Sequence, residues 1–121
     1  MNGLYFGDNL DVLREHIGTA SVDLVYLDPP FNSNASYGVL FKDDKGRASE
    51  SQAEAFRDSW AWGPSAESAF DDVRREGGEP ALLLHGLRKW LGETGLMAYV
   101  AMMAIRLIEL RRVLKPTGSL Y

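Results

Sequence analysis

Cysteine is absent from the 121 residues of this sequence. Structural disulfides and cysteine-ligated zinc are therefore excluded, as is any reaction that depends on a thiolate nucleophile from the chain itself. Histidine is scarce as well. The two histidines, His16 and His85, have no partner residues at the spacing of metal ligands, so the sequence predicts no metal site.

Long apolar runs and an excess of basic charge are also missing. No apolar run approaches the ~18 residues needed to cross a bilayer, and no basic stretch followed by an apolar core opens the chain. We therefore expect a cytoplasmic protein without membrane contact. The net charge of −4 and the isoelectric point near 5.1 argue against strong binding of a DNA duplex by this chain alone, because duplex affinity comes largely from neutralised phosphates.

The stretch from Val22 to Leu27 is apolar almost without interruption. This pattern is typical of a parallel strand that is covered on both faces. Pro29 and Pro30 follow closely, and two consecutive prolines are incompatible with a helix or a paired strand. The sequence therefore places Asp28 at the carboxyl end of a buried strand, where open α/β sheets bind their ligands.

The residues before this stretch predict a strand over 2–6 and a helix over 10–16. Together with the next strand they predict one crossover unit of a parallel sheet. Asp8 or Asn9 is suited to cap the helix, and Gly18 to end it in a left-handed conformation. For Asp8 and Asn9, capping alone and capping combined with a ligand contact both stay open.

The residues after the two prolines predict a long irregular segment. We expect an excursion over 35–80, a candidate lid, containing a weak edge strand over 36–42 and an exposed loop over 43–51. A short helix is expected over 53–62. Its aromatic residues Phe56, Trp60 and Trp62 are interpreted as packing against the body of the protein.

Helices are expected over 81–91 and over 95–114, the second capped by Thr94, before a final strand begins at 119. The apolar residues assigned to their core-facing stripes are Leu83, Leu87, Trp90 and Leu91 in the first helix, and Leu96, Val100, Met103, Leu107, Leu110 and Leu114 in the second. Basic residues gather near the end of the second helix: Arg106, Arg111, Arg112 and Lys115. They favour a solvated helix end over a phosphate site.

Asp28-Pro29-Pro30-Phe31 resembles the catalytic motif of the amino-methyltransferases that modify adenine N6 or cytosine N4 in DNA. Gly7-Asp8-Asn9-Leu10, Asn32-Ser33-Asn34 and the segment 111–121 extend the resemblance over essentially the whole chain. The motif order is similar to that of site-specific enzymes in which the catalytic loop precedes the cofactor loop. The resemblance implies an S-adenosylmethionine-dependent enzyme of the α/β class, with a Rossmann-like sheet of parallel strands and crossover helices.

The resemblance implies specific roles for the motif residues. Asp28 and the carbonyl of Pro29 hold the target amine, in a turn that Pro30 keeps rigid. Phe31 stacks on the base after the base has left the helix. An aspartate at the first motif position leans towards adenine N6 rather than cytosine N4. The residues assigned to S-adenosylmethionine are Asp8, Asn9 and Leu10.

Two parts of such an enzyme are missing from the sequence. It contains no G-x-G, so the cofactor loop of Phe-x-Gly-x-Gly type is absent, and it contains no candidate target-recognition region. We therefore expect residues 1–121 to be the N-terminal part of a methyltransferase catalytic domain, inactive by itself, with only part of the sheet. Double-stranded DNA would be reached through the missing recognition region. The sequence leaves open whether the protein forms a homo-oligomer or acts with a restriction partner.

Two alternatives also stay open. The same type of catalytic loop serves methyltransferases that act on RNA bases or on glutamine side chains of proteins, where asparagine is commoner at the first position. In a different class, the chain is a non-catalytic remnant or an α/β interaction module. The acidic charge and the missing cofactor loop favour that class, whereas an intact Asp28-Pro29-Pro30-Phe31 does not.

Overall fold

A computed structural model describes residues 2–29 and 60–121. Its elements, in chain order, are α1 (Asn9–His16), β1 (Val22–Val25), α2 (Pro64–Glu76), α3 (Gly78–Leu91), α4 (Gly95–Val113) and β2 (Leu114–Leu120). The described part is thus a mixed α/β structure with four helices and a two-stranded parallel sheet. None of these helices combines the length and the apolarity that a membrane span requires. The edge strand expected over 36–42 and the loop over 43–51 lie outside the described residues.

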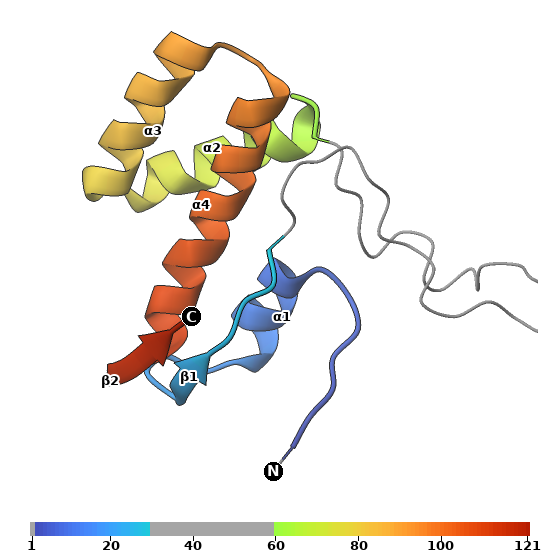
Figure 1. Cartoon of the computed structure of the whole chain (residues 1–121), viewed down its shortest axis with the longest axis vertical. Coiled ribbons are helices and arrows are strands. Elements are labelled where there is room, and N and C mark those ends of the chain that lie inside the picture. Colours follow the sequence, from blue (N-terminus) through green and yellow to red (C-terminus); the bar gives the residue numbers. More distant parts are fainter. Residues whose placement is uncertain (1, 30–59) are drawn as a thin grey trace, which may run out of the picture.

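Helix α4 is the element that joins the two halves of the structure (Figure 1). It contacts α2 and α3 at one end, and α1 and β2 at the other. The main apolar core forms around α2, α3 and the first part of α4; its buried residues are Ala69, Phe70, Val73, Leu84, Met97, Ala101 and Ile105. The strands and α1 therefore lie beside this helical core rather than around it.

The start of α4 was predicted correctly, but its buried face was predicted only in part, with Leu110 buried and Val100 packed against the core. Thr94 caps the helix, with its hydroxyl oxygen accepting from the Met97 amide at 3.2 Å. Of the predicted stripe, Leu96 and Leu107 are 51% and 44% exposed, whereas Leu110 is buried. The side facing the core contains instead Met97, Ala98, Ala101 and Ile105. Apolar residues surround most of α4, so periodicity alone did not select one face, and the small alanines allow the close approach of α2.

The irregular segment expected up to residue 80 was wrong over residues 64–76, where the structure has helix α2. Gly63 precedes it in an extended conformation and Pro64 occupies its first position, where the missing proline N–H costs nothing. Its buried residues are Ala66, Ala69, Phe70 and Val73. Their spacing of three, one and three residues is that of a core-facing stripe. The sequence therefore contained the signal for this helix. The segment before it, Trp60 to Trp62, is not helical, and the rest of the helix expected over 53–62 lies outside the described residues.

Helix α3 was predicted, although it begins at Gly78, three residues earlier than expected, and only part of its predicted stripe packs against the core. Leu84 is its buried residue, and Leu87 and Leu91 pack against the core. The predicted core residues Leu83 and Trp90 are 63% and 81% exposed. Which residues of α3 reach the core depends on its contacts with α2 and α4, and a single-helix pattern does not contain these contacts.

Strand β1 is a parallel strand, as the sequence predicted, but its partner is β2 rather than a strand over 2–6. Val22 pairs with Leu114, Leu24 with Ser119 and Val25 with Leu120, and the register shifts between Val22 and Leu24. This shift accommodates the segment around Pro116, which has no N–H to donate to a neighbouring strand. The turn expected at 116–118 is thus an irregularity within β2.

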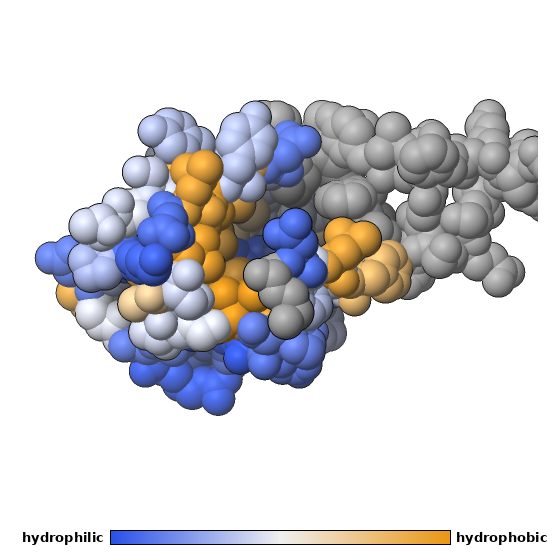
Figure 2. Space-filling view, turned by 90° about the horizontal axis from the view of Figure 1, so that it is seen from below, coloured by the Kyte–Doolittle hydropathy of each residue, from blue (hydrophilic) through white to orange (hydrophobic). Residues whose placement is uncertain are grey.

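The prediction that both faces of β1 are covered was wrong. Leu24 is 58% exposed and Tyr26 is 82% exposed, and Leu120 and Tyr121 of the neighbouring strand are exposed as well. Figure 2 views this end of the molecule and shows apolar side chains at its surface. Within the described part of the chain, no further strand or helix covers this face. The alternation that would reveal a half-exposed strand is hidden, because apolar residues occupy both faces of β1.

The strand expected over 2–6 is also wrong. These residues form no strand, and Leu4 is fully exposed. Tyr5 stacks on His16 at a ring distance of 4.8 Å instead of entering a sheet. The predicted crossover unit therefore lacks its first strand. Gly18 does not provide the left-handed residue after α1 either: the positive φ, 51°, is at Ala20.

Candidate functional site

Asp28 lies where the sequence predicted it, at the carboxyl end of β1. Two backbone hydrogen bonds extend the pairing of the two strands as far as Leu27, the residue before Asp28. Tyr121 N donates to Val25 O at 2.9 Å, and Leu27 N donates to Tyr121 O at 2.8 Å. Asp28 itself is exposed and Pro29 is half-buried. Pro30 and Phe31, the other two residues of the predicted catalytic motif, lie outside the described residues. Asp28 is therefore held by a paired strand while its carboxylate is accessible to solvent.

Asp8, the first predicted cofactor residue, caps α1 as expected. Its Oδ1 accepts a hydrogen bond from the Leu10 amide at 2.8 Å. The same carboxylate accepts from Nη2 of Arg106 at 2.8 and 2.9 Å. Asn9 accepts from Nε of Arg106 at 2.7 Å, and Leu10 is half-buried against the helical core. Two of the three predicted cofactor residues are thus bound by one arginine of α4.

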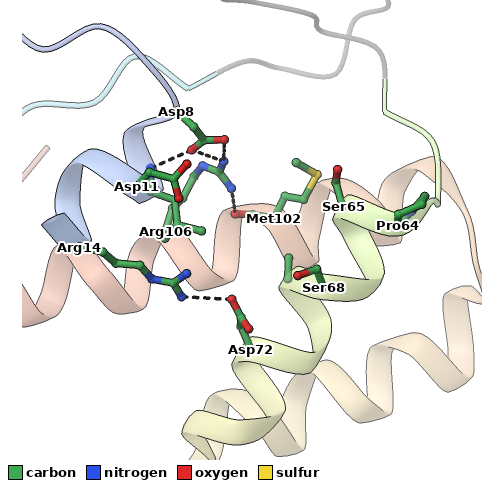
Figure 3. A pocket seen from close by; sticks show the side chains of 11 residues that line it. Asp8, Asp11, Arg14, Pro64, Ser65, Ser68, Asp72, Met102 and Arg106 are labelled. Carbon is green, nitrogen blue, oxygen red and sulfur yellow. Dashed lines mark hydrogen bonds and ion pairs between the residues drawn. The ribbon is translucent and has the colours of Figure 1, made fainter.

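Asp8 precedes α1, and Asp28 follows β1. An eight-residue helix is about 12 Å long, and the six residue steps from Val22 to Asp28 span about 20 Å when extended. The chain reverses between α1 and β1. In Figures 1 and 3 the trace that follows β1 passes the end of α1 that carries Asp8. The segment that follows β1 and the start of α1 therefore lie on the same side of the structure, although they belong to different elements.

A pocket of about 470 Å³ opens next to Asp8, between α1, α2 and α4 (Figure 3). Arg14 and Asp72 form an ion pair across it at 3.2 Å, and Arg106 with Asp8 forms another. The lining residues are Asp8, Leu10, Asp11, Arg14, Pro64, Ser65, Ser68, Ala69, Asp72, Met102 and Arg106. Most of the polar ones were not predicted, because they meet only when α2, which the sequence reading missed, packs beside α1.

The predicted solvated basic cluster is instead mostly engaged in contacts with other elements. Arg106 is bound to Asp8 and Asn9, and its side chain is only 15% exposed. Arg112 binds Glu109 and three groups in and after α1. Lys115 pairs with Asp23 of β1 at 2.9 Å. The sequence placed these cations on α4 and directly after it. It did not reveal the acidic partners of Arg106 and Lys115, because these partners lie more than 80 residues away in sequence.

A second polar cluster joins α2 to α3. Arg88 donates to both carboxylate oxygens of Glu67 at 2.9 and 3.0 Å and to Glu93 at 3.1 Å. Its guanidinium also lies over the rings of Trp62 and Phe70, at 4.5 and 4.6 Å from their centroids. The hydrogen bonds from Arg88 hold the pKa of Glu67 below its ordinary value, against a smaller opposing effect of desolvation. In turn, Glu67 raises the pKa of Arg88.

This cluster predicts a pH dependence of stability. Because the pKa of Glu67 is lower in the folded chain than in the unfolded one, its contribution is complete well above ~4.3, the unfolded-state pKa of glutamate, and is lost as the pH falls through the folded pKa. Replacing Glu67 by Gln should therefore lower the urea midpoint at pH 7 but much less at pH 3. Glu76→Gln, an exposed change at the other end of α2, is the control. An equal loss at both pH values would contradict the prediction.

The comparisons with known proteins give no further assignment: no family model, no curated protein and no solved structure matches the chain. Among residues 2–29 and 60–121, no group of three or more histidine, cysteine, aspartate or glutamate residues is arranged to hold a metal ion. The residues of the candidate site that the structure describes are Asp28 and Pro29 at the end of β1, and Asp8 and Asn9 at the start of α1.

Proposed function

We propose that this chain is the part of an S-adenosylmethionine-dependent DNA amino-methyltransferase that carries the catalytic loop, with adenine N6 favoured over cytosine N4 as the target. The observation that carries the proposal is the position of Asp28. It follows a hydrogen-bonded parallel strand, is exposed, and begins the sequence Asp28-Pro29-Pro30-Phe31. Open α/β sheets bind their ligands at this edge.

The proposed chemistry needs an oriented acceptor rather than a covalent intermediate. An exocyclic amine is a poor nucleophile because its lone pair is delocalised into the base. The carboxylate of Asp28 and the Pro29 carbonyl accept hydrogen bonds from the amine, which favours a pyramidal nitrogen. Bound S-adenosylmethionine would supply the methyl group: the nitrogen would bond to the methyl carbon as the carbon–sulfur bond breaks, and the proton released from the nitrogen would pass to solvent. Acceptors fixed before the reaction stabilise the positive charge that develops on nitrogen.

The target base must leave the duplex before the amine can reach Asp28. In this proposal Phe31 stacks on the extruded base. The net charge of −4 does not favour a phosphate-binding surface on this chain. In this proposal, double-stranded DNA is therefore bound by a recognition region that this sequence does not contain.

The residues at the start of α1 are suited to contact the adenine end of S-adenosylmethionine. S-adenosylmethionine supplies an electrophilic methyl group on a sulfonium. The half-exposed carboxylate of Asp8, together with Asn9 and Leu10, would hold the adenine end, and Asp8 borders an open pocket. The sequence has no Gly-rich loop for the remainder. The proposal therefore includes a further segment that supplies this loop and completes a Rossmann-like sheet, whose crossover helices would cover the exposed apolar residues Leu24 and Tyr26.

The proposal predicts methyl transfer by the protein that contains this chain together with its cofactor loop and recognition region. Tritiated S-adenosylmethionine and unmethylated plasmid DNA should yield labelled DNA, with the label in N6-methyladenine after digestion and chromatography. Label in N4-methylcytosine would change the target base only. Label in RNA or in a glutamine-containing peptide, but not in DNA, would favour the related methyltransferases. No label in any of these substrates would contradict methyl transfer.

One observation favours a second candidate function, a non-catalytic interaction module. The paired strands and the residues that follow them expose Leu24, Tyr26, Leu120 and Tyr121, and exposed apolar patches often mark interfaces. This candidate predicts that substitution of Asp28 has no functional effect, whereas substitution of Tyr26 disrupts binding of a partner. The two candidates are therefore separated by the same set of variants.

A further inference from the structure

We propose that Arg106 is a positioning residue that fixes the orientation of Asp8 and Asn9; its link to cofactor binding rests on the function proposed above. The guanidinium of Arg106 uses all three of its nitrogens. Nε donates to Asn9 at 2.7 Å, and Nη2 donates to both oxygens of Asp8 at 2.8 and 2.9 Å. The remaining nitrogen, Nη1, donates to the carbonyl of Met102 at 2.8 Å.

The contact with Met102 fixes the direction of the guanidinium. Met102 lies one turn earlier in α4, so this bond ties the arginine head to its own helix. The side chain of Arg106 is only 15% exposed, and the part of α4 just before it is anchored in the core through Ala101 and Ile105. The guanidinium plane is therefore set by α4, and Asp8 and Asn9 align to it. A planar fork with fixed donors orients a carboxylate in a way that a lysine ammonium does not.

Asp8 needs such support because the elements around it provide little. Helix α1 has eight residues and no buried side chain, and an isolated helix of this length is unstable in water. Residues 2–7 are all exposed. The Leu10 amide and Arg106 are the two groups in the described part of the chain that bind the Asp8 carboxylate. Without Arg106, the carboxylate would keep one backbone hydrogen bond and several accessible rotamers.

The position of α1 as a whole does not depend on Arg106 alone. Arg112, six residues later in α4, donates to the carbonyls of Leu13 and Ile17 at the other end of α1, at 2.8 and 3.1 Å. Helix α1 is thus held at its start by Arg106 and at its end by Arg112. This division separates the two roles: loss of Arg106 should disturb the orientation of Asp8 more than the docking of α1.

The first test uses the 121-residue chain and needs no enzymatic activity. Amide hydrogen exchange at Leu10 reports the hydrogen bond from this amide to Asp8. In Arg106→Met we expect this exchange to be about tenfold faster, as for the loss of one charge-assisted interaction. Arg106→Lys, which keeps the charge but not the fork, should restore only part of the protection. Lys115→Met, which removes an exposed ion pair of β1, is the matched control and should leave Leu10 unchanged. Unchanged exchange in both Arg106 variants would overturn the proposal.

The second test uses the complete methyltransferase. Arg106→Met should raise KM for S-adenosylmethionine about tenfold and change kcat by less than about twofold, because a positioning role affects cofactor binding rather than the bound reaction. The double variant Asp8→Asn/Arg106→Met should show no further increase over Asp8→Asn. Faster Leu10 exchange with an unchanged KM would overturn the positioning role and leave a structural one. If the wild type transfers no methyl group, the proposed function fails, whereas the exchange test still decides whether Arg106 holds Asp8.

Discussion

Replacing Asp28 by Ala should lower methyl transfer by about 10³-fold or more, at the level reached when a preorganised hydrogen-bonding partner is removed from an active site. The carboxylate is the acceptor that pyramidalises the target amine in the proposed mechanism, and Asp28 is the acidic residue among residues 26–29, which directly follow β1. The loss should fall on kcat at saturating S-adenosylmethionine, because Asp28 acts on the nitrogen as charge develops. Single-turnover transfer from labelled cofactor to duplex DNA measures it.

The same change should have little effect on folding. Asp28 is exposed, and none of the hydrogen bonds or ion pairs found in the described part of the chain involves its carboxylate. We therefore expect the free energy of unfolding to change by no more than ~0.5 kcal/mol. Asp23→Ala is the matched control: Asp23 lies on the same strand, is exposed and pairs with Lys115, but points to no candidate site. Transfer within twofold of the wild type for Asp28→Ala would remove this residue from the mechanism.

Replacing Arg112 by Met should produce the largest loss of stability, about 3–5 kcal/mol in the free energy of unfolding. Arg112 donates to Glu109 at 2.7 Å, and Glu109 is the buried charged residue of the described structure, 7% exposed. Without the arginine this carboxylate is left buried and uncompensated. The carbonyls of Leu13 and Ile17 at the end of α1 lose their donor in the same change. Urea unfolding at pH 7 measures the loss.

Two further variants test the reason for that loss. Arg111→Met, at the neighbouring exposed arginine of the same helix turn, should change stability by no more than ~0.5 kcal/mol. The double variant Arg112→Met/Glu109→Met should be more stable than Arg112→Met alone, because replacement of both partners removes the uncompensated charge. If the double variant is the less stable of the two, the buried carboxylate is not the cause.

The candidate site was predicted in part because its residues follow local rules. Asp8 caps α1 through a hydrogen bond two residues away, and Asp28 follows an apolar strand that two prolines end. Both inferences need only neighbours in sequence. Arg106 was placed on a helix correctly, but it lies in the body of α4 rather than at its end, and its role was not foreseen, because its carboxylate partner is 98 residues away.

The errors in the fold have the same origin. The stripe assigned to α4 included Leu96 and Leu107, whereas the structure buries Met97 and Ile105. An element that is apolar on several sides has no face preferred by its own sequence, and the partner helix decides which side is buried. Helix α2 was a different kind of error, because Pro64 and the spacing of its apolar residues were present in the sequence and were interpreted as an irregular segment.

The sequence by itself determined the absence of cysteine chemistry, the acidic charge, the helices α1, α3 and α4 with two of their caps, and the position of Asp28 after a strand. These properties depend on composition and on interactions over a few residues. Only the tertiary structure decided which face of α4 is buried, that β1 pairs with β2, and that arginines of α4 hold both ends of α1. Such contacts join residues distant in sequence, and their energies exist only once α4 is packed in the core.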